Sequence, residues 1–299
     1  MKREDVKCEF TFHASQHIAS ATKLGIMGNM GTLYVVGTPI GNLEDITLRA
    51  LRVLREVKLI AAEDTRRTRK LLARYDIHTP LTSYFEHNKL AKLDTILAAL
   101  REHDVALVSE AGMPGLSDPG YELIRAAIEA GVPVVAVPGP SAPITALVVS
   151  GLPTDSFVYL GFLPRRANER RQLLQSVAGE RRTLVAFEAP HRLLKALEDI
   201  AEILGDRPLA IACELTKMYE EVWRGTAWGA IAWFTAHPPR GEFTLVIGGA
   251  AEPEKWDEEQ VRAEIERLLA RGTSRREAIK LVTEASGWSR REVYRLALR

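Results

Sequence analysis

The sequence is poor in cysteine and has no histidine pattern typical of a metal site. Its two cysteines, Cys8 and Cys213, are too few for a disulfide framework or a thiolate metal centre, and they suit a reducing cytosol. None of the seven histidines shows His-Glu-x-x-His spacing. We therefore expect a cytoplasmic protein without a bound metal.

An excess of charge of either sign is also missing. The chain has 40 basic and 39 acidic side chains, which leaves a net charge of +1. So weak an overall field attracts nucleic acid little, and any such contact must come from local basic clusters. Hydrophobic residues make up 46% of the chain and charged residues 26%, as in soluble globular proteins.

The sequence offers no convincing membrane span or signal peptide. Residues 131–154 carry no charged side chain, but five prolines interrupt them. A buried strand, a tight turn and a buried helix explain this segment better than a membrane span. Residues 1–30 lack the apolar core of a signal peptide. We interpret residues 1–30 as a disordered extension and expect the true start near Met30, with Met27 just upstream, rather than at Met1.

Apolar runs alternate with helical patterns as far as residue 150. This alternation predicts an α/β domain, residues 31–150, in which helices cover a mostly parallel sheet. The expected strands are 32–37, 58–62, 105–109 and 132–137, and the expected helices are 45–56, 65–75, 90–103, 118–130 and 141–150.

The next block, residues 151–251, has fewer helices per strand. That ratio predicts a second α/β domain built on a mixed sheet. Its expected strands are Phe157–Leu163, Thr183–Glu188, Leu209–Leu215 and Glu242–Gly248, and its expected helices are 168–178, 190–204 and 225–236.

The last block, residues 252–299, ends in a basic helical module with a short internal repeat. Ser274–Ala278 and Ser289–Val293 each read as a capping box with an arginine pair in the first turn, and Gly287 separates them. Two short helices of this kind resemble a helix-turn-helix. The arginines either contact nucleic-acid phosphates or lie on a solvated bundle face, and we favour phosphate contact because arginine there opposes the helix dipole.

Three Gly/Pro-rich turns, residues 37–41, 109–120 and 138–142, each connect an apolar run to a helix. In a parallel sheet such turns lie together at the carboxyl ends of the strands, where ligands bind. They therefore predict a small-molecule pocket lined largely by backbone. The first turn is not a Walker A loop, and it lacks the glycine spacing of a dinucleotide fingerprint, although Glu63-Asp64 lies where such a fold keeps its ribose-binding acid.

Each turn also has a simple structural interpretation. Ser117 or Asp118 is expected to cap a helix that starts at Pro119, and Ser141 to cap the helix that follows it. Capping does not explain why Gly112, Pro114 and Gly115 crowd ahead of Asp118, so we favour a loop that wraps a ligand.

Basic residues gather near the predicted pocket. Arg66, Arg67, Arg69 and Lys70 follow Glu63-Asp64. A second run, Arg165, Arg166, Arg170 and Arg171, follows the first strand of the second domain. On the structural interpretation Asp64 or Thr65 caps a helix and the basic residues are its solvated face. Together with the basic tail, the two runs predict a polyanionic substrate rather than a small neutral one.

Several motifs together carry a family resemblance. In order they are Gly37–Leu51, Glu63–Arg66, Ser109–Gly120, Val137–Ala142, Gly161–Pro164, Glu188–Arg192 and Glu214–Lys217. With them the chain, from about Gly31 to Arg299, resembles the tetrapyrrole methylase superfamily of class III, S-adenosylmethionine-dependent methyltransferases. Within it, the chain is most similar to the 16S rRNA (cytidine-2′-O-)-methyltransferases.

The resemblance implies methylation of the ribose 2′-hydroxyl of cytidine 1402 in 16S rRNA by a homodimer that holds S-adenosylmethionine in a cleft between its two α/β domains. By motif, the implied cofactor contacts are Pro39, Glu110, Met113, Ser141 and Ala142, followed by Phe162, Leu215 and Thr244. Glu110 stands where the family usually has Asp. Its side chain is one methylene longer, and we expect cofactor binding to survive the change.

The hydroxyl must lose a proton, and a carboxylate or a neutral lysine can take it. The candidates are Glu63, Asp64, Glu188, Glu214 and Lys217. Our first choice is Glu63 and Asp64, with Arg66 orienting phosphate. The expected RNA contacts are Arg67, Arg69, Lys70, Arg165, Arg166, Arg275, Arg276, Arg290 and Arg291.

Two other functions stay open. One is a small-molecule methylase acting on a tetrapyrrole, which the basic tail argues against. The other is an RNA-binding protein with a vestigial pocket.

Overall fold

The computed structural model describes residues 30–86, 88–251 and 255–298. These residues form two compact units. The first runs up to Pro39 and continues as Leu43–Pro140, and the second comprises Ile40–Asn42 and the chain from Ser141 onward. Apart from Met30, the extension expected at residues 1–30 lies outside the described residues.

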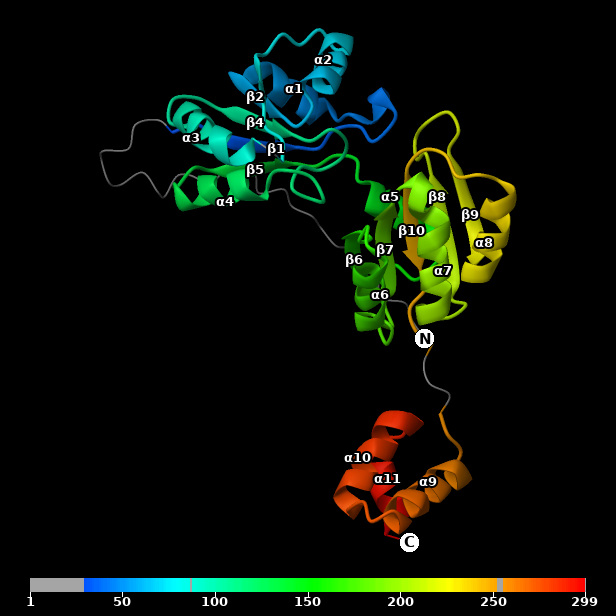
Figure 1. Ribbon diagram of the computed structural model, residues 1–299. Helices are drawn as coiled ribbons and strands as arrows, with labels where there is room; N and C mark the ends of the chain where they lie inside the picture. The colour runs from blue at the N-terminus through cyan, green and yellow to red at the C-terminus, as the bar shows by residue number, and fades with distance from the viewer. Residues whose placement is uncertain (1–29, 87, 252–254, 299) are drawn as a thin grey trace, which may run out of the picture. The chain divides into compact units, whose positions relative to one another are not determined.

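The first unit contains a parallel sheet with the strand order β3-β2-β4-β1-β5 (Figure 1). Its strands are β1 (Leu33–Val36), β2 (Leu59–Ala62), β3 (Leu81–Ser83), β4 (Val105–Val108) and β5 (Val134–Val137). The predicted parallel α/β arrangement is confirmed. The sequence does not predict β3, because its three residues, Leu-Thr-Ser, form no apolar run.

Helices cover both faces of this sheet. On one face, α1 (Leu48–Glu56) and α2 (Thr65–Arg74) bury a core with β1 and β2. On the other, α3 (Lys89–Leu100) and α4 (Tyr121–Glu129) bury a second core. A short 3₁₀ helix, Leu43–Asp45, precedes α1.

Helix α4 begins later than the sequence predicts. Its N-cap is Gly120, and no side chain caps it, so the expectation that Ser117 or Asp118 would be the cap is wrong. Gly115, Ser117 and Gly120 all have positive φ angles, of 81°, 65° and 157°. These angles keep the chain out of the right-handed helical region until Tyr121. The loop after β4 is therefore longer, and the Asp118 carboxyl is not used as a cap.

The second unit contains a mixed sheet with the strand order β6-β7-β10-β8-β9. Only β6 and β7 are parallel, which confirms the predicted mixed sheet. The strands are β6 (Phe157–Phe162), β7 (Thr183–Glu188), β8 (Pro208–Cys213), β9 (Glu221–Thr226) and β10 (Phe243–Ile247). The helix expected from residue 225 begins instead at Ala227, because Thr226 ends β9 and its side chain caps the helix.

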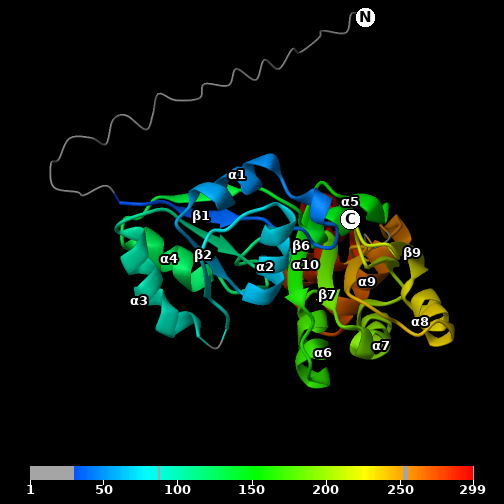
Figure 2. The same cartoon turned by 90° about the horizontal axis from the view of Figure 1, so that it is seen from above.

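Three helices, α6 (Ala167–Ser176), α7 (Leu193–Leu204) and α8 (Ala227–Ala236), bury the main core of this unit against one face of the sheet. The other face is covered by α5 (Ala142–Ser150), which contacts β7, β8, β9 and β10 (Figure 2). Placing this helix in the first domain was therefore wrong. The boundary lies after Pro140, because the buried Ala146 and Leu147 of α5 pack on the second sheet.

The C-terminal helices α9 (Glu258–Ala270), α10 (Arg275–Ser286) and α11 (Arg290–Ala297) share a small apolar core. Ser289 and Glu292 form a complete capping box, and the Ser274 hydroxyl accepts the Glu277 amide. Gly287 ends α10 in a left-handed conformation with a φ of 68°. The predicted pair of short helices joined by a tight turn is confirmed.

Residues 131–154 form β5, a turn and α5, as the sequence predicts. Among the described residues, no helix has the length and apolar character needed to cross a membrane.

The three Gly/Pro-rich turns meet at the carboxyl ends of β4, β1 and β5. Thr38 and Gly112 form an antiparallel bridge with N···O distances of 2.9 and 3.0 Å, which joins the first turn to the second. Gly37 lies against Gly139 of the third turn. A Cβ atom on Gly37 would lie 2.8 Å from the Gly139 Cα, closer than real side chains approach. The prediction that these turns lie together is confirmed.

This contact leads to a prediction for Gly37→Ala. The added methyl would meet the backbone of Gly139 and the sulfur of Met113. Because backbone cannot move aside cheaply, we expect the free energy of unfolding to fall by about 1–3 kcal/mol, measured by urea denaturation.

The matched control is Gly179→Ala. A Cβ atom there would have nothing within 4 Å, and the residue does not have a positive φ angle. Its stability should stay within about 0.5 kcal/mol of the wild type. Equal stability of both variants would contradict the close approach of the two turns.

Candidate functional site

The loop after β4 is tied to the first turn by hydroxyl groups. Thr38 Oγ1 donates to the Ser109 carbonyl oxygen over 3.3 Å, and Ser109 Oγ lies within hydrogen-bond distance, 3.3 Å, of the carbonyl oxygens of both Ala111 and Gly112. These bonds hold the loop in one conformation without using a helix cap. Hydrogen bonds of buried hydroxyl groups therefore fix the backbone of these turns.

Three of the expected cofactor contacts lie on the parts of these turns that belong to the first unit. Pro39 is buried, Met113 is half-buried and Glu110 is exposed. The Met113 sulfur lies close to the Cα of Gly37. The first unit thus combines an apolar surface, a thioether and a carboxylate on neighbouring turns.

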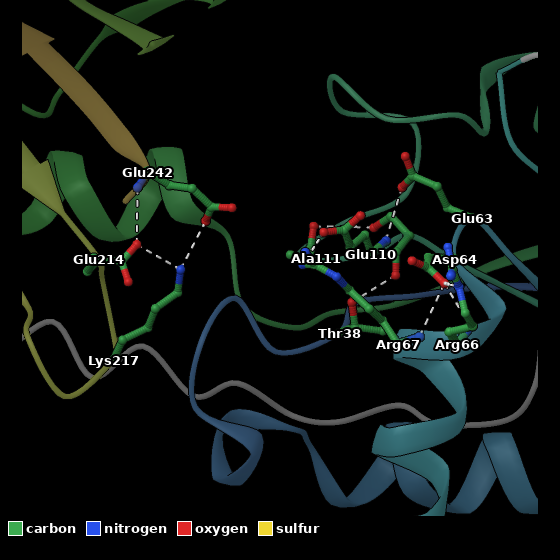
Figure 3. A network of polar contacts seen from close by, with 11 residues as sticks. Thr38, Glu63, Asp64, Arg66, Arg67, Glu110, Ala111, Glu214, Lys217 and Glu242 are labelled. Atoms are coloured by element: carbon green, nitrogen blue, oxygen red, sulfur yellow. Dashed lines mark hydrogen bonds and ion pairs between the residues drawn. The ribbon is translucent and has the colours of Figure 1, made fainter. Parts of the chain in front are cut away.

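Carboxylates from two strand ends gather around Glu110 (Figure 3). The Glu110 backbone N–H donates to Glu63 Oε2 over 3.0 Å, and its side chain forms an ion pair with Arg67. Glu63 follows β2, and Arg67 lies in the first turn of α2. Arg67, which we expected to contact RNA, is thus held by Glu110.

Asp64 is the N-cap of α2, as the structural interpretation of the sequence proposed. Its Oδ1 accepts the amides of Arg66 and Arg67 over 2.7 and 3.3 Å. The bond from the Arg66 amide is the largest influence on the Asp64 carboxyl and holds its pKa below the ordinary value. A carboxylate that is stabilised in this way is a weaker proton acceptor than an ordinary aspartate. Glu63 does not cap a helix, and its Oε2 accepts the Glu110 amide.

Asp118 is the functional candidate that sequence reasoning missed. It is half-buried in the loop after β4, where its side chain shares a hydrogen bond with Ser109. Burial, and then the negative charge of Glu63, raise the pKa of Asp118 to about 7, with a smaller contribution from Glu110 and an opposing one from the Ser109 bond. A carboxyl that titrates near neutral pH can hold or release a proton. The crowded glycines and proline ahead of it were the only signal in the sequence.

The remaining cofactor candidates belong to the second unit. Ser141 is the N-cap of α5, as predicted, but its hydroxyl makes no capping hydrogen bond. Ser141 and Ala142 are half-buried. Thr244 is buried in β10, in register with Phe187 of β7 and Ala212 of β8.

The loop after β8 carries a second polar cluster (Figure 3). Lys217 Nζ lies 2.9 Å from Glu214 Oε1 and 3.2 Å from Glu242 Oε2. Burial opposes the charge on Lys217, but the bond to Glu214 and the charge of Glu242 outweigh it and raise the pKa of the ammonium group. Lys217 is therefore protonated and is a poor base, contrary to its inclusion among the candidate proton acceptors.

The end of the first Gly/Pro turn packs on this loop. The Asn42 amide donates to Thr216 Oγ1 over 3.0 Å, and a Cβ atom on Gly41 would lie 2.7 Å from the carbonyl oxygen of the buried Leu215. Glu214 and Thr216 have positive φ angles of 50° and 65°. Left-handed residues other than glycine cost free energy and cluster at functional sites.

Phe162 follows a β-bulge in β6 and is 56% exposed. It borders a cavity of about 610 Å³ formed by residues 162–165, Ala189, His191 and Arg192. Arg165, which we expected to contact RNA, lines this cavity, whereas Arg166 pairs with Glu169 over 3.0 Å.

The other expected RNA contacts lie on exposed helix surfaces. Arg69 and Lys70 are exposed on α2, and the tail arginines are exposed at the starts of α10 and α11. Arg276 and Arg290 border a hollow of about 570 Å³ between these two helices. In the described part of the chain, no group of three or more His, Cys, Asp or Glu side chains could hold a metal ion.

The model of the family described as Tetrapyrrole (Corrin/Porphyrin) Methylases matches residues 32–229. The chain is also similar to curated proteins named ribosomal RNA small subunit methyltransferase I. It is 50% identical to the protein from Synechocystis sp. over 90% of this chain and 98% of that protein. It is 53% identical to the one from Thermotoga maritima, over 74% of this chain and 99% of that protein.

Among solved structures, a Thermus thermophilus uroporphyrin-III-C-methyltransferase is similar with a TM-score of 0.52 and 25% identity, over 74% of this chain and 95% of that chain. A cobalt precorrin-4 methyltransferase is similar with a TM-score of 0.57 over 74% of this chain and 96% of that chain; at 19% identity it supports the fold alone.

The position of Asp118 predicts an unusual pH dependence of stability. Its pKa in the folded chain, about 7, lies above the ordinary 3.8, so the folded state binds the proton more tightly than the unfolded chain between these values. The free energy of unfolding therefore falls as pH rises through this window. Asp118→Asn removes the titrating group, so the stability of the variant should not show this decrease. The difference in melting temperature, variant minus wild type, should therefore increase from pH 5 to pH 8.

Asp64→Asn is the matched control. The pKa of Asp64 is lowered, so its contribution is lost only in acid, as pH falls through that pKa. Its melting temperature relative to wild type should be constant from pH 5 to pH 8. A constant difference for Asp118→Asn as well would show that Asp118 does not titrate in this range.

Proposed function

Since the chain belongs to the tetrapyrrole methylase family, and within it groups with the ribosomal RNA small subunit methyltransferases I, we propose that it methylates the ribose 2′-hydroxyl of cytidine 1402 in 16S rRNA. The chain is an S-adenosylmethionine-dependent methyltransferase. The observation that carries the proposal is its 50% identity to a named relative over 98% of that protein.

The residues of the three turns suit the cofactor. Pro39 is buried and stiffens the first turn, Met113 offers a polarisable thioether, Glu110 offers a carboxylate, and the Ser141 hydroxyl is not used as a helix cap. A carboxylate accepts hydrogen bonds from hydroxyl groups and attracts a cation. When bound, S-adenosylmethionine supplies an electrophilic methyl group on a positively charged sulfur.

The contribution of the chain is to position the hydroxyl and to take its proton. Displacement at a sulfonium needs no acid for the leaving group, so positioning and exclusion of water carry most of the rate gain. Glu63 is the proposed proton acceptor. Asp64 is the second choice, because α2 uses its carboxylate as a cap. Arg66 is 87% exposed and is proposed to orient a substrate phosphate.

We propose that the basic helices of the tail contact the RNA backbone. Arg275, Arg276, Arg290 and Arg291 are all exposed in the first turns of α10 and α11. Arg69 and Lys70 of α2 are proposed to add contacts. Such contacts supply affinity and orientation without reading the base sequence.

We also propose that the chain acts as a homodimer in the cytoplasm. Ile144 and Val148 of α5 are 45% and 68% exposed, although this helix buries its opposite side against the second sheet. Exposed apolar surface of this kind is typical of protein interfaces. A monomeric mass in light scattering would contradict the proposal.

The test of the function uses purified chain and labelled S-adenosylmethionine with three acceptors: undermethylated small ribosomal subunits, naked 16S rRNA and a porphyrinogen. We expect label on RNA, at the 2′-oxygen of cytidine 1402. Label on the porphyrinogen alone would favour a tetrapyrrole methylase. Failure to bind the cofactor in calorimetry would favour an RNA-binding protein with a vestigial pocket.

The role of the tail predicts the behaviour of a variant with four arginines replaced by glutamine. The replaced residues are Arg275, Arg276, Arg290 and Arg291. We expect weaker RNA binding. For single-stranded RNA, the salt dependence of log Kd should be shallower by roughly 0.7 for each phosphate that the variant no longer neutralises. Cofactor affinity should not change.

The control is the double variant Arg262→Gln and Arg267→Gln. These α9 arginines pair within their own helix with Glu258 and Glu264. Their replacement should leave the salt dependence unchanged. If the four-arginine variant binds RNA as tightly as this control, the tail does not contact phosphate.

A further inference from the structure

The cavity beside Phe162 has the size and lining of a ligand site. It lies where the parallel strands β6 and β7 both end, and its volume of about 610 Å³ falls within the range of small-molecule pockets. It is lined by residues 162–165, at the end of β6, and by Ala189, His191 and Arg192, which follow β7. All of these residues belong to the second unit.

An aromatic ring stands at the edge of this cavity. The pairing of β6 with β7 shifts between Tyr159 and Gly161, and Gly161 has a φ of 67°, so a bulge precedes Phe162. Bulges of this kind redirect the next side chain and are frequent beside functional sites. The Phe162 ring rests on Phe187 with a centroid distance of 5.1 Å and is still 56% exposed. A supported, exposed ring is a platform on which a nucleobase can stack.

A buried ion pair orients the arginine in the cavity wall. Arg192 Nη2 lies 2.6 Å from Glu188 Oε1, and Arg192 Nη1 donates to the Leu163 carbonyl over 3.3 Å. The Glu188 side chain is fully buried, and its Oε2 has no hydrogen-bond partner in the described structure. Burial raises the pKa of Glu188, while the Ala189 amide and the charge of Arg192 act against that rise. A buried ion pair adds little to the free energy of unfolding. The effect of the Glu188–Arg192 pair is therefore to hold the Arg192 guanidinium in place.

The mouth of the cavity carries a positive charge from Arg165, which is exposed and, within the described residues, has no ion pair. His191 is exposed beside it. The carboxylate nearest to the cavity in the chain, Glu188, is buried and already paired with Arg192. A phosphate would meet a fixed guanidinium and further positive charge without displacing an acidic side chain.

We propose that this cavity binds one nucleotide of single-stranded RNA, with its base stacked on Phe162 and its phosphate held by Arg192 and Arg165. Only an unpaired nucleotide can present its base to an aromatic ring, which selects a loop or bulge of the RNA over a duplex. This inference rests on the proposed RNA substrate. It also assigns Phe162 to the RNA rather than to the cofactor.

The experiment compares Phe162→Leu and Arg192→Gln with wild type, using 16S rRNA, a short single-stranded oligoribonucleotide and the matching duplex. We expect KM for rRNA and Kd for the single strand to rise roughly tenfold in each variant, whereas duplex binding and the Kd for S-adenosylmethionine stay within about twofold. Arg192→Gln should also reduce the salt dependence of single-strand binding by about 0.7, and Arg192→Lys should preserve that dependence.

Arg182→Gln is the control. Arg182 lies beside the opposite end of β7 and pairs with Glu180, so its replacement removes the same charge away from the cavity. Phe162→Leu, at an exposed position, provides the test should Arg192→Gln fail to fold. The inference is wrong if Phe162→Leu and Arg192→Gln bind RNA as tightly as Arg182→Gln does. It is also wrong if they lose affinity for S-adenosylmethionine and keep their affinity for RNA.

The outcome for wild type separates the two proposals. If wild type neither binds nor methylates RNA, the proposed function fails and the inference fails with it. If wild type methylates RNA but Phe162→Leu and Arg192→Gln bind RNA as tightly as the Arg182→Gln control, the proposed function stands and the nucleotide site is wrong.

Discussion

The close approach of two glycine backbones, Gly37 and Gly139, is the constraint on which the first unit depends. A Cβ atom on either residue would come within 3 Å of the backbone of the other. The strands that lead into these turns, β1 and β5, are neighbours in the sheet, and β4 lies on the other side of β1. The Thr38–Gly112 bridge then joins the loop after β4 to the same cluster. Backbone contacts thus bring the three turns together without the help of a helix cap.

This arrangement also determines the charge at the turns. Glu63 and Glu110 come from different strand ends and lie close enough to Asp118 for their charges to act on it, and Arg67 pairs with Glu110. The raised pKa of Asp118 follows from this crowding and from its burial. A region rich in carboxylates suits a sulfonium cation, and it contains acceptors for the proton that a hydroxyl must lose during methyl transfer.

The cavity of the second unit presents the opposite charge. This cavity, at the ends of β6 and β7, has cationic side chains and an exposed aromatic ring, and the carboxylate beneath it is buried and paired. A positively charged methyl donor and a polyanionic acceptor make contrary electrostatic demands. The proposed assignments satisfy both. The carboxylates lie at the strand ends of the first unit, and the proposed RNA contacts are the basic side chains of α2, of the tail and of the cavity in the second unit.

The sequence by itself determined most of the alternation of strands and helices, the parallel or mixed character of each sheet, the three turns and the paired helices of the tail, because each depends on local periodicity, glycine and proline positions or capping residues. It did not predict the strands β3 and β9. Tertiary structure decided how the polar side chains are used. Asp118 does not cap α4, since left-handed residues extend the loop, and α5 packs on the second sheet. The Glu188–Arg192 pair borders a cavity because β6 lies parallel to β7. Burial and neighbouring charge, which give these side chains their chemistry, arise only when segments distant in the sequence pack together.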